Sequence, residues 1–147
     1  MFNPHLLLNH FRARLAAPDA FGPGPCPVNP GNEPVRSAGK PVRFDVAAAP
    51  GDEIPFTEGT ERRVWTVTLT AAAVPGTGLA LLLDAAHRAA RLYAPFDSKR
   101  GAFRLGETRF FVTGVTVGAP RFENGAARAA VTYSLTSETP RGPRGGR

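Results

Sequence analysis

Metal binding and acid–base catalysis both draw on histidine, and this sequence has three histidines. His5 and His10 are five residues apart, whereas two ligands on one face of a helix need a spacing of four. His87 is followed by Arg88, whose positive charge disfavours a bound cation nearby. We therefore expect each histidine to be a surface or helix-flank residue, and the sequence predicts no metal and no other cofactor.

Acidic residues cluster between residues 50 and 61, where the sequence is PGDEIPFTEGTE. Calcium sites usually take ligands from alternating positions around a glycine turn, which this segment lacks. A long, exposed, solvated loop is the better interpretation, with Ile54 and Phe56 free to touch another surface. The signatures of serine hydrolases, P-loop NTPases and zinc proteases do not occur in the sequence. A small enzyme is therefore the least favoured class.

Arginine dominates the basic residues. The formal net charge is +6, and all of the 18 Lys and Arg residues except Lys40 and Lys99 are arginines. The planar guanidinium group binds phosphate and carboxylate through paired hydrogen bonds, so the bias would suit recognition of either. A GC-rich genome would produce the same bias, since Ala, Gly and Pro are also frequent. Seven of these arginines lie in expected strands or near the C-terminus: Arg104, Arg109, Arg121, Arg128, Arg141, Arg144 and Arg147.

A nucleic-acid-binding accessory protein stays open as one alternative for this arginine set. Sequence-independent contact with phosphates would make binding strongly salt-dependent. However, the expected strands lack the aromatic platforms on which single-strand binders stack bases. Retention on DNA that falls with salt would distinguish this class from a structural protein.

The composition predicts one globular domain that is rich in turns. The chain has 147 residues, of which 42% are hydrophobic, so it can bury a core without a metal or a disulfide. The 16 glycines and 15 prolines predict many loops. Cys26 is the one cysteine and forms no intramolecular disulfide, which suits a reducing compartment. We find neither a signal peptide nor an apolar run of ~18 residues, so we expect a soluble protein made in a cytoplasm.

The centre of the expected fold lies in residues 62–93, where the hydrophobic period changes from two to about 3.6. Alternation around Trp65, Val67 and Leu69 predicts a half-buried strand. After a Pro-Gly break at residues 75–78, apolar residues recur every three or four positions as far as Tyr93, which predicts a helix. A strand and a helix that each bury one face would cover each other.

Elements on the N-terminal side are an amphipathic helix and a strand separated by a long loop. Asn3 and Pro4 are a favourable helix start, and Leu7, Phe11 and Leu15 would face the core as far as Ala17. Residues 18–41 contain seven prolines, so we expect an irregular loop there. Residues 41–48 alternate and predict a strand.

The C-terminal third predicts short antiparallel strands. We expect strands at residues 102–105 and 108–118, and a hairpin turn at Asn124-Gly125 before a last strand that ends near Ser137. A two-residue turn would align the apolar residues of the last strand with Gly118, Thr116 and Gly114. The more apolar set on residues 108–118 is instead Phe111, Val115 and Val117. We therefore predict a β-bulge within residues 118–122, or a longer turn.

Together these elements predict an α+β fold: an antiparallel four- to five-stranded sheet with one helix packed on it and an N-terminal helix alongside. We expect a single domain over residues 1–139. Residues 140–147 are too poor in apolar groups to pack, so they should form a flexible basic C-terminal tail.

Four stretches carry a further resemblance. They are the N-terminal helix ending in Arg12 to Leu15, the strand RVWTVTL at residues 63–69, the loop PGTG at residues 75–78 before a helix, and the closing strand AVTY at residues 130–133. In this order, over most of residues 4–137, the chain resembles the tail terminator proteins of long-tailed bacteriophages, the group typified by the U protein of phage lambda.

The resemblance implies a structural virion protein rather than an enzyme. Such a protein forms a ring, here expected to be a homohexamer, that caps the tail tube and joins it to the head–tail connector protein in the neck. Its partners would be further copies of itself, the tail tube protein and the connector, with no membrane contact and with DNA only passing through the ring. Assembly would take place in the host cytoplasm. Another neck or head-completion protein, or a tail tube protein, remains the nearest alternative.

A ring needs two unlike patches on each subunit. The acidic segment and the arginine-bearing strands are opposite in charge and would form such a pair. The candidate residues for this subunit or tube interface are Asp52, Glu53, Phe56, Glu58, Arg62, Arg104, Arg121 and Arg128.

Overall fold

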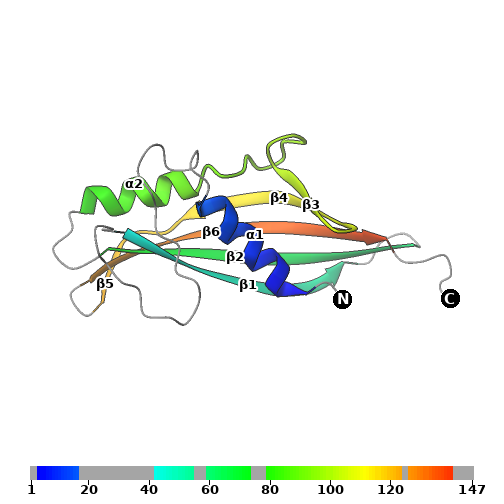
Figure 1. Ribbon diagram of the computed structural model, residues 1–147, viewed down its shortest axis with the longest axis horizontal. Helices are drawn as coiled ribbons and strands as arrows, with labels where there is room; N and C mark the ends of the chain where they lie inside the picture. The colour runs from blue at the N-terminus through cyan, green and yellow to red at the C-terminus, as the bar shows by residue number, and fades with distance from the viewer. Residues whose placement is uncertain (1–2, 17–41, 55–58, 74–78, 124–125, 141–147) are drawn as a thin grey trace.

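A computed structural model describes residues 3–16, 42–54, 59–73, 79–123 and 126–140 of the chain. It contains two helices and six strands in these ranges (Figure 1). They are, in chain order, α1 (Pro4–Ala16), β1 (Val42–Ile54), β2 (Thr60–Ala73), α2 (Leu79–Ala89), β3 (Ala102–Leu105), β4 (Thr108–Val117), β5 (Arg121–Glu123) and β6 (Ala126–Pro140).

All strand pairs are antiparallel, and the strands form one sheet in the order β1-β2-β6-β4-β3, with β5 paired to β6. Both helices contribute to the one hydrophobic core that covers a face of this sheet, and α1 contacts β1 (Figure 1). The predicted α+β architecture is therefore confirmed. The sheet has six strands because the three residues of β5 pair with β6 separately from β4.

Helix α1 begins and packs as the sequence predicts. The backbone N–H of His5 donates to Asn3 Oδ1 at 2.9 Å, so the Asn3 side chain caps an amide that the helix leaves free. Leu7, Phe11 and Leu15 are buried against the sheet. This spacing of four places the three side chains on one stripe of the helix.

The hairpin of β1 and β2 corrects the prediction of a loop over residues 50–61. β1 continues to Ile54 and β2 begins at Thr60, with an irregular register between Pro50 and Glu53. Proline is tolerated here because β1 is an edge strand, and a bulge takes up the one extra residue of β1. Acidic and Gly/Pro-rich sequence is thus compatible with a strand whose side chains face water. Phe56 and Glu58 lie outside the described residues.

The core-facing alternation of β2 is confirmed, since Trp65, Val67, Leu69 and Ala71 are all buried. Helix α2 ends at Ala89, earlier than the predicted end at Tyr93. It packs on the sheet through four residues at helical spacing: Leu82, Ala85, Ala86 and Ala89.

Tyr93 is nevertheless buried, in the turns that follow α2. Nearby, the hydroxyl of Tyr133 on β6 donates to the carbonyl oxygen of Ala89. This bond satisfies one of the carbonyl groups that the end of a helix leaves without a partner. It ties the C-terminus of α2 to the middle of the sheet.

The predicted bulge before the last hairpin is confirmed. β5 pairs Arg121 with Arg128, whereas β4 pairs Val117 with Val131, so residues 118–120 lie opposite only two residues of β6. The extra residue shifts the register by one and aligns the apolar faces of β4 and β6.

A second bulge lies at Thr113, between the pairs that Val112 and Gly114 make with β6. It reverses the alternation along β4: Phe110 and Val112 face the core before it, and Val115 and Val117 pack against the core after it. The prediction that Phe111 belongs with Val115 and Val117 is therefore wrong, because the alternation does not run unbroken through Thr113.

Candidate functional site

The open sheet presents two edges, and the charged residues of interest divide between them. One edge is strand β1, which we call the β1 edge. The other is formed by β3, the outer side of β4, and β5, which we call the β4 edge. Because three strands separate β1 from β3, a second molecule would meet quite different residues at the two edges.

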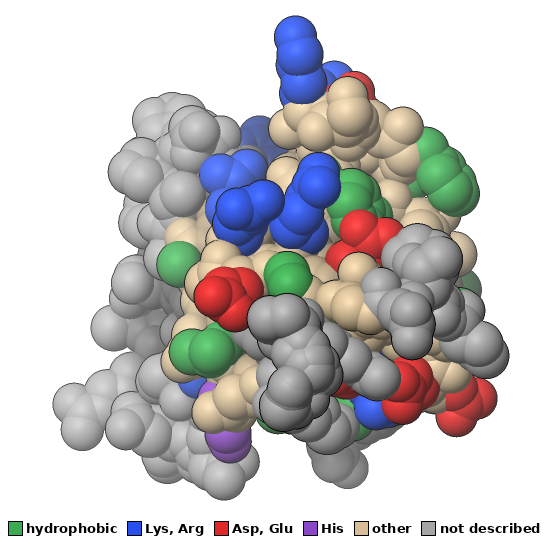
Figure 2. Space-filling view, turned by 90° about the vertical axis from the view of Figure 1, so that its right-hand side faces the viewer, with side chains coloured by type: hydrophobic (Ala, Val, Ile, Leu, Met, Phe, Trp, Pro, Cys, Tyr) green, Lys and Arg blue, Asp and Glu red, His purple; other side chains and the backbone are tan. Residues whose placement is uncertain are grey.

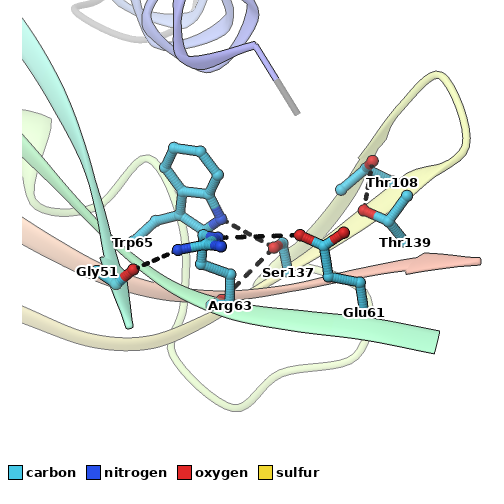
Figure 3. Close-up of polar contacts among 7 residues, drawn as sticks. All are labelled: Gly51, Glu61, Arg63, Trp65, Thr108, Ser137 and Thr139. Carbon is cyan, nitrogen blue, oxygen red and sulfur yellow. Dashed lines mark hydrogen bonds and ion pairs between the residues drawn. The ribbon is translucent and has the colours of Figure 1, made fainter. Parts of the chain in front are cut away.

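Acidic side chains lie at the C-terminal end of the β1 edge. Asp52 and Glu53 are exposed there, next to the bulge, and Glu61 follows on β2. Arg63 holds this end together: its guanidinium donates to the carbonyl oxygen of Gly51 at 2.7 Å and lies 3.9 Å from Glu61 (Figure 3). The bulge is thus fixed by a side chain from the neighbouring strand.

The same end of the sheet is tied together on its core side by hydroxyl groups (Figure 3). The indole Nε1–H of Trp65 donates to Ser137 Oγ at 2.8 Å, which links β2 to β6 inside the core. Thr108 and Thr139 share a hydrogen bond of 2.9 Å between their hydroxyl oxygens, which links β4 to β6. These bonds hold the three strand ends in register beneath the charged residues.

A row of charged residues crosses this end of the sheet on the face away from the helices. The register places Arg62, Glu138, Arg109 and Arg104 side by side on β2, β6, β4 and β3. Arg62 lies 3.4 Å from the Glu138 carboxylate, so this predicted interface residue is engaged within the chain. Figure 2 shows Lys and Arg side chains gathered beside Asp and Glu side chains at this end.

Arg104 faces another arginine, Arg109, directly across the β3–β4 pair, and both side chains are exposed. Like charges in such a pair destabilise the sheet. The Arg109 guanidinium lies 5.1 Å from the centre of the Phe111 ring, and a hollow of about 370 Å³ beside both arginines also includes Glu107 and Glu138 in its lining. These two arginines would gain from an acidic partner.

A second row of arginines crosses the opposite end of the same face. The register aligns Arg43, Ala72, Arg128 and Arg121 on β1, β2, β6 and β5. In the described part of the chain, Nε of Arg43 and Nε of Arg128 are buried without a hydrogen-bond partner. A hollow of about 490 Å³ lies beside Arg121 and Arg128, with small residues such as Gly118, Ala119 and Ala130 in its lining.

The structure therefore divides the predicted interface residues into two groups. Arg62 and Arg104 lie at the end that also carries Asp52 and Glu53. Arg121 and Arg128 lie at the other end, beside Arg43. Arg109 belongs to the arginine set that the sequence singles out but not to the predicted interface, and Arg43 and Glu138 belong to neither, because only strand order and register bring these residues together.

His10 is packed more closely than its predicted surface position implies. Its ring stacks on Phe103 with 4.1 Å between ring centres, and its Nε2 forms a hydrogen bond with the Tyr93 hydroxyl. Burial, with a smaller effect from the charge of Arg14, lowers the pKa of His10 to about 4. His10 is thus a neutral side chain at pH 7 that joins α1 to β3 and to the turns after α2.

The low pKa of His10 makes stability depend on pH. The unfolded chain takes up this proton near pH 6.5, whereas the folded chain resists it until about pH 4. The contribution of neutral His10 to the free energy of unfolding is therefore present above pH 6.5 and is lost as the pH falls towards 4. We expect a loss of about 1–2 kcal/mol, which is modest because the ring is still partly hydrated. Urea unfolding of the wild type at pH 7 and pH 4 should show this loss, and His10→Phe should show a smaller one. An identical loss in both proteins would contradict the assignment to His10.

In the described ranges no three His, Cys, Asp or Glu side chains gather where they could hold a metal ion. Neither α1 nor α2, the helices of those ranges, has the length and apolar character that a membrane span requires.

Comparison with known proteins gives the fold alone. No protein-family model and no curated protein sequence matches the chain. The chain is similar to a solved structure with a TM-score of 0.60 and 15% sequence identity, over 93% of this chain and 96% of that one. Both chains thus share one arrangement of helices and strands along nearly their whole length, at an identity too low to carry function from one to the other.

Proposed function

We propose that this protein is a structural virion protein that assembles into a ring, as the tail terminator proteins of long-tailed bacteriophages do. The observation that carries the proposal is the difference in charge between the two edges of the sheet. The β1 edge ends in Asp52 and Glu53, whereas the β4 edge carries exposed basic residues: Lys99, Arg100, Arg104, Arg109 and Arg121. Two unlike surfaces on one subunit allow head-to-tail contacts, which close into a ring when the rotation is right.

In this role the protein would have no catalytic function and no cofactor. A hexameric ring would cap the finished tail tube, stop further growth and present its other face to the head–tail connector protein. Its location would be the tail–neck region of the virion, with DNA passing through the ring. The order of helix, strands, Gly-Pro loop, helix and closing hairpin, on which the resemblance rests, supports this proposal.

Electron microscopy of the purified protein and of assembled particles tests the proposal. Rings of one size at the junction between tail and head are the expected result. If the protein occurs in particles only as single subunits, or is missing from them, the proposed role is wrong. Rings stacked along the tube would instead indicate a tail tube protein, and rings in the head a head-completion protein.

If Arg121 and Arg128 contact the next copy, reversing their charge to Glu should weaken self-association by about tenfold or more, because two cations that would attract an acidic surface become anions that repel it. Sedimentation equilibrium measures the change. The double variant Arg88→Glu with Arg91→Glu is the matched control, since it changes the net charge equally, at one residue on α2 and one in the turn that follows it. Unchanged association of the Arg121 and Arg128 variant would count against these residues as an interface.

One observation favours a second candidate function, that of a nucleic-acid-binding accessory protein. Arg43, Arg128 and Arg121 lie in one row across the sheet, and the last two line a hollow, which suits contact with phosphates. In that case the Arg121 and Arg128 reversal would reduce salt-dependent retention on DNA while leaving self-association unchanged. The same pair of variants therefore distinguishes the two functions.

A further inference from the structure

The loop of residues 94–101, which we call the Phe96 loop, is tightly folded. It projects between α2 and β3 as a yellow-green loop at the top of Figure 1. The Ala94 N–H donates to the Arg100 carbonyl at 3.0 Å, and the Gly101 N–H donates to the Asp97 carbonyl at 2.8 Å. Two further backbone bonds anchor the loop to Val112 on β4: Phe96 N–H to Val112 O at 3.0 Å and Val112 N–H to Gly101 O at 2.7 Å. The loop therefore belongs to the β4 edge.

Asp97 stabilises the loop from inside. Its Oδ1 accepts hydrogen bonds from the backbone N–H groups of Lys99 at 2.8 Å and Arg100 at 2.9 Å. These bonds lower the pKa of Asp97, so its carboxylate stays charged. The Asp97 carboxylate thus binds backbone N–H groups of the loop. The side chains of Lys99 and Arg100 are exposed cations at the loop surface.

Phe96 is held in an unfavourable way. Its φ is +61°, and it is the one non-glycine residue of the described ranges with a positive φ. Its side chain is also 83% exposed, so the strain is not offset by burial of the ring in this chain. Strained residues of this kind persist where the surrounding structure enforces them, and they concentrate at sites of contact or catalysis. An exposed aromatic side chain on a tightly bonded loop that also carries two exposed cations is a suitable anchor for binding another protein.

The opposite edge offers a surface that matches these groups. Asp52 and Glu53 are exposed at the end of β1, and the exposed apolar side chain of Pro50 lies beside them on the same edge strand. Pro50 has no N–H to donate, and the bulge next to it interrupts the edge. Side chains rather than an added strand would therefore carry a contact at this position.

We infer that the Phe96 loop of one copy binds the C-terminal end of the β1 edge of a second copy. The Phe96 ring would lie against Pro50, and the two cations of the loop would face Asp52 and Glu53. Because the two surfaces lie on opposite edges of one sheet, the contact is head to tail and can repeat. The inference rests on the proposed ring and names the residues that join neighbouring copies.

Phe96→Gly is the decisive variant, because glycine adopts positive φ without strain. The variant should unfold at a temperature about 2–4 °C higher than the wild type, since the strain is relieved. It should also self-associate at least about tenfold more weakly in sedimentation equilibrium, since the anchor is gone. Leu81→Ala, which removes an exposed apolar side chain from α2, is the matched control and should leave association unchanged.

A charge exchange tests the orientation of the contact. Lys99→Glu with Arg100→Glu should lose self-association, as should Asp52→Lys with Glu53→Lys, and mixing the two variants should restore a complex between them. The inference is overturned if Phe96→Gly associates as the wild type does, if the mixture does not recover, or if the wild type stays monomeric at all concentrations. Microscopy of the particles decides the proposed function separately, because a ring joined through other residues would still appear there.

Discussion

Replacing Trp65 with alanine should lower the free energy of unfolding by about 3–5 kcal/mol, the largest effect we expect from a core substitution. The Trp65 side chain is 1% exposed and lies on β2, between β1 and β6, with its ring 6.2 Å from that of Phe110 on β4. Alanine would leave a cavity and remove the donor that Ser137 uses. Urea unfolding measures the loss.

Trp65→Phe separates the hydrogen bond from the packing. It keeps an aromatic ring but cannot donate to the Ser137 hydroxyl, so we expect a loss of about 1–3 kcal/mol. Ser137→Ala breaks the same bond, and the double variant should cost less than the sum of the two single variants because they share it. Strict additivity, or a Trp65→Phe variant as unstable as Trp65→Ala, would contradict this account.

Gly101→Ala should lower the free energy of unfolding by about 2–4 kcal/mol, since the added methyl group would overlap fixed backbone atoms. A Cβ at this position would lie 2.0 Å from the Ala94 carbonyl oxygen and 2.9 Å from the Asp97 carbonyl oxygen. Neither oxygen can move without breaking the hydrogen bonds that fold the Phe96 loop. Thermal and urea unfolding measure the effect.

Gly114→Ala is the control for this substitution, because the nearest atom to a Cβ there is Ser134 Cβ at 3.9 Å, an ordinary contact. It should change stability little. Gly101→Ala should also weaken self-association, as Phe96→Gly does, but with the opposite change in stability. A Gly101→Ala protein as stable to unfolding as the wild type would contradict this prediction, because it would show that the Phe96 loop accommodates the methyl group without losing stability.

The parts of the fold that the sequence predicts well are those decided by local geometry. Asn3 caps α1 because its side chain reaches amides two or three residues away. The alternation of apolar and polar residues along β2 and β6 predicts both strands correctly, because each strand has one face on the core and one face towards water. The bulge before β5 could also be predicted. Counting back from a two-residue turn pairs the apolar residues of the last strand with polar or glycine positions, and one extra residue corrects this register.

Other features depend on contacts that a linear pattern does not contain. The end of β1 is polar because it is an edge, so Gly51 and Asp52 resemble a loop in sequence. Nothing in the sequence around Thr113 indicates a bulge, so unbroken alternation predicts the wrong face for Phe111. The strain at Phe96 arises from bonds to Val112 and within the loop, and nothing in the sequence around it indicates a positive φ.

The arginine groups show the same limit for the candidate site. Arg104 and Arg121 look equivalent in sequence, since both lie in short strands of the C-terminal third. Strand order puts Arg104 beside Arg109 and near Glu138, and puts Arg121 beside Arg128 in the row that begins with Arg43. Only the register decides which charges act together.

The two bulges make the chain path from Arg109 to Arg121 two residues longer than the stretch of β6 that it faces, which runs from Glu138 to Arg128. A sheet in which one strand has more residues than the neighbouring strand that it faces must curve. Copies of the chain joined edge to edge would each be rotated by the same angle relative to the one before. When a whole number of these rotations makes one full turn, the assembly closes. The number of units in a closed assembly would then follow from the curvature of a single unit rather than from any one contacting side chain.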